Sequence, residues 1–188
     1  MRAVLHIAGA FLAAASAVRG LSYALPAGFP VSILASSDCK MPQNFNVSQL
    51  VVWEPATANP NQNDTADFVF TDSDTGIVTP CHKNASSINV AWPGDAPRYA
   101  CDNPLVLFIW QSGKLLMIEQ ACPETSGSTK YEASGSLSPG FQCEPTDPTL
   151  PMGEGFLCVS VDQNMAGKFT SLQPAPPPPA PPSGSSTS

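Results

Sequence analysis

Short runs of alternating hydrophobic and polar residues cover most of the chain, separated by clusters of Gly, Pro, Asn, Asp and Ser. From residue 36 to residue 172 these runs have the length of β-strands, and none continues as a long helical pattern. The two-residue period of a strand places Phe68 and Phe70 on one face. The pattern predicts a single all-β domain, either an antiparallel β-sandwich or a β-barrel.

The individual runs predict where the strands lie. A first strand is expected over 45–53 and a second over 67–71, which a turn at 72–76 connects to a strand at 77–79. Later strands are expected near 131–137, 141–143, 156–161 and 169–172. The segment 55–65 between the first two strands is polar and carries two prolines, so we expect an exposed loop there.

The clearest single element is a β-hairpin. The apolar runs 105–110 and 115–119 flank the polar tetrad Gln111-Ser112-Gly113-Lys114, and Gly accepts the positive φ that such a turn requires. A buried helix is the alternative, but the length of each run and its β-branched and aromatic content favour strands. Because both runs are apolar on both faces, the hairpin should be central and covered from two sides.

The two ends of the chain differ in composition from the middle. Residues 1–17 combine Arg2, an apolar run and the small residues Ala15-Ser16-Ala17, which is typical of a signal peptide cleaved after Ala17 or a few residues later. The run is shorter than the roughly 20 apolar residues that span a bilayer, so no membrane span is expected. We therefore divide the chain into a signal peptide (1–17), a short N-terminal segment (18–35), a β-rich secreted domain (36–172) and a disordered Pro/Ser-rich tail (173–188).

Six cysteines follow the leader, and no two of them form a Cys-x-x-Cys motif. An even number at wide spacing indicates disulfide bonds, and hence a secreted protein that is extracellular or cell-wall associated. Six cysteines allow 15 pairings. We expect Cys81–Cys101 and Cys143–Cys158, each of which closes one local β excursion, and Cys39–Cys122 as the remaining pair.

Part of the chain, from Phe45 to Cys122, resembles a known family. The likeness rests on Phe68-x-Phe70 with Asp72-x-Asp74-Thr75-Gly76, on Tyr99-x-Cys101-Asp102-x-Pro104, and on Phe108 leading to Leu116-x-Ile118-x-Gln120-x-Cys122. These motifs resemble the fungal secreted domain family named after the major allergen of Alternaria. The resemblance implies a disulfide-bonded β-barrel, a small extracellular or wall-associated protein at the interface with a host, and no known catalysis.

Charge and histidine content limit the partners, metal sites and reactions that we expect for this chain. The formal net charge of −7 repels phosphate backbones, so nucleic acid is not an expected partner. Once the leader is removed, His82 is the one histidine left, which argues against a zinc site, a histidine triad or any cofactor held by histidines. Asp72, Asp74 and Gly76 are similar to the start of a calcium loop, but the twelfth position is Lys83 instead of Glu, so an Asx turn is favoured and no metal is expected.

Three sequons and three tryptophans are the remaining candidate features. Asn46, Asn63 and Asn84 each begin an Asn-x-Ser/Thr sequence and are predicted glycosylation sites, with Asn46 the weakest because it lies near a strand start. Among the tryptophans, Trp92 precedes Pro93-Gly94 and so should lie in a loop. It is the candidate binding aromatic, whereas Trp53 and Trp110 are expected to pack in the core.

These features favour a secreted, non-enzymatic interaction protein, effector-like or allergen-like, that binds a host protein or a small apolar ligand. The alternative is a cell-wall-associated carbohydrate-binding or structural protein, which the sequons and the Pro/Ser/Thr tail support. A carboxylate-based hydrolase is a third hypothesis, since acids are plentiful, but sequence spacing does not reveal whether two of them face one cleft.

Overall fold

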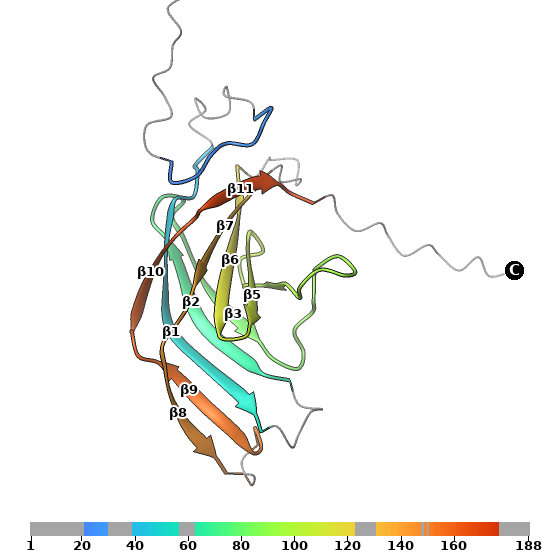
Figure 1. Ribbon diagram of the computed structural model, residues 1–188, viewed down its shortest axis with the longest axis vertical. Helices are drawn as coiled ribbons and strands as arrows, with labels where there is room; N and C mark the ends of the chain where they lie inside the picture. The colour runs from blue at the N-terminus through green and yellow to red at the C-terminus, as the bar shows by residue number, and fades with distance from the viewer. Residues whose placement is uncertain are drawn as a thin grey trace, which may run out of the picture.

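The computed structural model describes residues 21–29, 39–56, 63–122, 131–147, 149 and 151–176. These residues contain no helix and form eleven strands (Figure 1): β1 (Asn44–Pro55), β2 (Thr65–Asp72), β3 (Ile77–Lys83), β4 (Tyr99–Ala100), β5 (Val106–Gln111), β6 (Lys114–Ala121), β7 (Tyr131–Leu137), β8 (Phe141–Thr146), β9 (Gly155–Ser160), β10 (Asn164–Lys168) and β11 (Ser171–Pro174). The predicted signal peptide and the tail beyond Pro176 lie outside the described residues.

The strands form two antiparallel sheets that pack face to face (Figure 1). The first sheet has the order β3-β2-β1-β9-β8, and β10 also pairs with β1. The second sheet has the order β11-β7-β6-β5-β4. The all-β, antiparallel fold predicted from the sequence is confirmed, in its sandwich form.

The sheets are not closed into a barrel, so the barrel expectation, including the barrel that the family resemblance implies, is wrong. Two edges meet where β3 approaches β4, but β4 has two residues and Pro80 on β3 has no N–H to donate. A single backbone bond from Asp102 N to Pro80 O (3.0 Å) joins these edges. At the other side, the chain passes from β10 in the first sheet to β11 in the second through Phe169 and Thr170.

Aromatic side chains from both sheets fill the core. Phe68 on β2 meets Phe108 on β5 edge to face, with ring centroids 5.0 Å apart, and Phe45 on β1 packs on Phe169 at 4.9 Å. These contacts follow from the two-residue period, because every second side chain of β2 points inward.

Residues 21–29, the described part of the predicted N-terminal segment, pack against the β-sheet domain. Tyr23 is buried and its hydroxyl donates to Pro42 O, and Phe29 packs against Tyr131 with ring centroids 4.6 Å apart. At the other end, β11 continues to Pro174, two residues past the predicted domain end. The composition change at Pro174 therefore does not coincide with the end of the sheet.

The central hairpin is present, but its turn is shorter than predicted. The β5–β6 ladder continues to the pair Gln111–Lys114, which leaves a two-residue turn of Ser112 (φ 52°) and Gly113 (φ 72°). Two successive positive φ values match the twist of the strands, which is why two residues suffice. Leu107 and Ile118, on the outer face of the second sheet, are 9% and 2% exposed, so the hairpin is covered on both faces at this point.

The three disulfide bonds join the pairs predicted from the sequence. Cys81–Cys101 links β3 to the residue after β4, Cys143–Cys158 bridges directly opposed positions of β8 and β9, and Cys39–Cys122 ties the segment before β1 to the end of β6. Three disulfides in one domain indicate an oxidising, extracellular type of environment. Among the described residues, no helix has the length and apolar character to cross a membrane.

Candidate functional site

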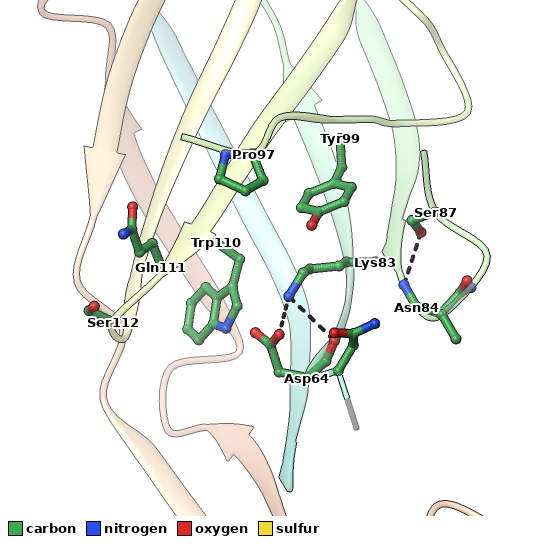
Figure 2. A pocket seen from close by; sticks show the side chains of 11 residues that line it. Asp64, Lys83, Asn84, Ser87, Pro97, Tyr99, Trp110, Gln111 and Ser112 are labelled. Carbon is green, nitrogen blue, oxygen red and sulfur yellow. Dashed lines mark hydrogen bonds and ion pairs between the residues drawn. The ribbon is translucent and has the colours of Figure 1, made fainter. Parts of the chain in front are cut away.

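A cavity of about 400 Å³, here called the Lys83 pocket, opens where β3 ends beside the β5–β6 turn (Figure 2). Its volume falls within the range of small-molecule sites. Loop residues before β2 and after β3 supply one side, and β4, β5 and the hairpin turn supply the other. The pocket is lined by Asn63, Asp64, Lys83, Asn84, Ala85, Ser87, Pro97, Tyr99, Trp110, Gln111 and Ser112.

Lys83 provides a buried positive charge in this pocket. It occupies the last inward position of β3, after Thr79 and Cys81, and is 8% exposed. Its ammonium forms an ion pair with the Asp64 carboxylate and lies 5.5 Å from the centroid of the Tyr99 ring. A buried ammonium requires such partners, because desolvation without them is costly.

Two aromatic residues flank the ammonium in Figure 2. Tyr99 lies on one side with its hydroxyl directed toward Lys83, and burial, followed by the negative charge of Asp64, raises the pKa of this phenol. Trp110 lies on the other side and is fixed edge to face against Phe141, at 5.8 Å between ring centroids. Gln111 and Ser112 add an amide and a hydroxyl at the hairpin turn. The pocket therefore combines aromatic rings with hydrogen-bonding groups.

A second cavity of about 270 Å³, here called the Trp92 pocket, contains the aromatic residue predicted to bind ligand. Trp92 is half-buried in the loop between β3 and β4, as its Pro-Gly neighbours indicated. The other lining residues come from this loop, from the connection between β4 and β5, from the second sheet and from the end of the described chain: Val90, Ala91, Arg98, Ala100, Pro104, Leu107, Gln120, Glu132 and Pro176.

The remaining tryptophan, Trp53, belongs to the core. It is 4% exposed, and its indole nitrogen donates to Thr146 Oγ1 at 3.1 Å. Trp110 is also largely buried, at 7% exposed, as predicted, but it additionally lines the Lys83 pocket. The sequence pattern predicts only the core position of Trp110.

The sequons differ in their surroundings. Asn63 and Asn84 are exposed and both line the Lys83 pocket. Asn46 is half-buried on β1, which pairs there with β2 and β10. A strand with neighbours on both sides leaves Asn46 the least accessible of the three. Glycosylation of these residues stays a prediction.

Within the part of the chain that the structure describes, two acids are fully buried, and neither lines the Lys83 pocket or the Trp92 pocket. Asp72 Oδ1 accepts hydrogen bonds from the backbone N–H groups of Asp74 (2.6 Å) and Thr75 (3.3 Å), which confirms the predicted Asx turn. Burial raises the pKa of Asp72, and burial together with Asp72 raises that of Glu119 on β6 to about 8. Raised pKa values in a cleft would suggest a hydrolase, whereas here the acids are enclosed.

His82 lies on the surface. Its ring is 48% exposed, and its Nδ1 is 2.6 Å from Asp67 Oδ1 on the neighbouring strand. His82 lines neither described pocket. Within the described residues, no group of three or more His, Cys, Asp or Glu side chains is placed to hold a metal.

Comparisons with protein-family models, with curated proteins and with solved structures find no match to this chain. The resemblance to the Alternaria allergen family therefore rests on the quoted sequence motifs alone.

Sequence reasoning missed Lys83, Asp64 and Tyr99 as site residues. One signal in the sequence points to Lys83. It follows Thr79 and Cys81 at the two-residue period of the inward-facing positions of β3, where burying a lysine without a partner would cost free energy. Its partner Asp64 and the ring of Tyr99 come from other segments, so only the folded chain brings the three together.

Proposed function

We propose that this chain is a secreted, non-enzymatic binding protein whose Lys83 pocket holds one sugar ring of a glycan. The observation that carries the proposal is the placement of Tyr99 and Trp110 on either side of a buried, ion-paired ammonium. Aromatic rings can stack on the apolar face of a sugar, while ammonium, carboxylate and amide groups can bond to its hydroxyls.

The polarity of the pocket favours a glycan over a small apolar ligand. An apolar molecule would cover the partly exposed carboxylate of Asp64 and the exposed amide of Gln111 without offering them hydrogen bonds, which costs free energy. A sugar supplies hydroxyl groups that both donate and accept. Of the two functions expected from the sequence, the polar lining of the pocket favours the carbohydrate-binding one.

The absence of catalysis is part of the proposal. The pocket residues include no cysteine or histidine nucleophile or base, and Asp64, the acid among them, is engaged by Lys83. A glycosidase of the usual kind needs two carboxyl groups across the scissile bond. The pocket lining has one.

The proposal is tested by measuring the binding of chitin and β-glucan oligosaccharides to the mature protein by isothermal titration calorimetry. Tyr99→Phe keeps the ring and removes one hydroxyl, so affinity should fall about three- to tenfold, the value of one hydrogen bond. Lys83→Met should weaken binding further. His82→Ala, next in sequence but outside the pocket, is the matched control and should bind normally.

Two results would contradict the proposal. One is failure of every oligosaccharide to bind at millimolar concentration while circular dichroism shows an intact sheet. The other is binding that Tyr99→Phe and Lys83→Met leave unchanged, which would place the glycan elsewhere on the molecule.

A further inference from the structure

The Trp92 pocket lies between a loop and the outer face of the second sheet. Val90 and Trp92 belong to the loop between β3 and β4, whereas Leu107, Gln120 and Glu132 belong to β5, β6 and β7. The pocket therefore crosses three neighbouring strands, and Trp92 provides its aromatic ring.

Hydrogen bonds within the loop hold this pocket in shape. Asn89 Oδ1 accepts from the N–H groups of Ala91 (2.9 Å) and Arg98 (3.0 Å), and Val90 N donates to Arg98 O at 2.9 Å. Arg98 is in turn anchored to the second sheet, because its Nη1 donates to Glu132 Oε2 at 3.0 Å. The loop is thus fixed to β7 by a largely buried ion pair.

The C-terminal end of the sheet leads directly to this pocket. In the β7–β11 ladder, Gln173 lies opposite Glu132, the residue that binds Arg98. Three residues later, Pro176 lines the Trp92 pocket. Twelve residues follow Pro176, beginning with Pro177-Pro178-Pro179-Ala180-Pro181-Pro182.

We propose that the Trp92 pocket binds the chain's own proline-rich tail, with the prolines directly after Pro176 as the occupants. Proline-rich segments favour the polyproline II conformation, so they lose little entropy on binding, and aromatic grooves recognise them repeatedly. The side chains of Arg98 and Gln120 on the pocket wall can donate hydrogen bonds to carbonyl groups of the tail. A polyproline II helix has no internal hydrogen bonds, so these carbonyl groups are free to accept them. This site is separate from the Lys83 pocket and independent of the glycan proposal.

Covalent attachment favours the chain's own tail over another proline-rich segment. A short tether presents the tail at an effective concentration on the order of 1 mM, so even a peptide affinity of about 0.1 mM would keep the pocket mostly occupied. Because Pro176 already lines the pocket, the next prolines need no long loop to reach it.

The test uses the indole N–H signals of the three tryptophans in ¹H–¹⁵N NMR spectra. The mature full-length chain is compared with a chain that ends at Pro176, which keeps all eleven described strands and the whole lining of the pocket. Truncation should shift the Trp92 signal and leave those of the buried Trp53 and Trp110 in place. A synthetic peptide of residues 177–188 should restore the signal, whereas the same peptide with every proline replaced by Ser should not.

Trp92→Leu should abolish peptide binding, and calorimetry with this variant provides a second readout. The proposal is overturned if truncation leaves the Trp92 signal unchanged, or if the peptide does not bind the truncated chain at millimolar concentration. The proposal is also overturned if the position of the Trp92 signal in the full-length chain depends on protein concentration. The occupant of the pocket would then be the tail of a second copy.

Discussion

At the scale of single residues, the most unusual group is Glu119, a carboxyl at a fully buried position of β6. Both of its oxygens and Asp72 Oδ2 are buried without a geometrically defined hydrogen bond. Burial, and then the neighbouring charge of Asp72, raises the pKa of Glu119 to about 8. The folded protein therefore holds a proton here at neutral pH, where an unfolded chain, with an ordinary glutamate pKa of 4.5, has released it.

This difference predicts that the free energy of unfolding falls as pH rises from about 4.5 to about 8, and then levels off. The sign follows because the folded state binds more protons than the unfolded state in this window. Glu119→Gln, which resembles the protonated acid in shape and can donate hydrogen bonds, should flatten this part of the profile. Urea unfolding of both proteins between pH 5 and pH 9 measures the effect, and equal slopes in the two proteins would refute it.

At the scale of elements, the sequence predicted the long strands better than the short ones. The strand at 131–137 matches β7, because its alternation is regular, and the central hairpin was predicted apart from its turn length. β4 and β10 were missed. β10 contains Gly167, which is unfavourable in a strand by propensity but necessary here, since a Cβ would lie 2.2 Å from the Phe45 ring.

Gly135 on β7 lies at a similar close approach and gives a test of the packing between the sheets. A Cβ at this position would lie 2.1 Å from the backbone oxygen of Lys168, which cannot move without displacing the chain. Gly135→Ala should therefore destabilise the domain by about 3 kcal/mol. In Gly140→Ala the nearest atom to the new Cβ is 4.0 Å away, so this control should stay within about 0.5 kcal/mol of the parent. Similar melting temperatures for both variants would contradict the described contact.

At the scale of the whole molecule, local patterns predicted the all-β class and the disulfide pairs, but not how the sheets meet. The choice between sandwich and barrel depends on hydrogen bonds at strand edges, such as the one that Pro80 on β3 cannot donate, and a single strand's pattern does not encode these. The Lys83 pocket was not predicted for the same reason. It joins Asp64, Tyr99 and Trp110 from three segments that only the fold brings together.

The most direct test of the central claim is to map an added oligosaccharide onto the mature protein by NMR. If the Lys83 pocket holds the sugar ring, the indole signal of Trp110 and the amide signals of Asn84 and Gln111 should shift together and saturate at one dissociation constant. The Trp92 and Trp53 signals should not move. Saturable binding that shifts Trp92 and leaves Trp110, Asn84 and Gln111 unchanged would contradict the account.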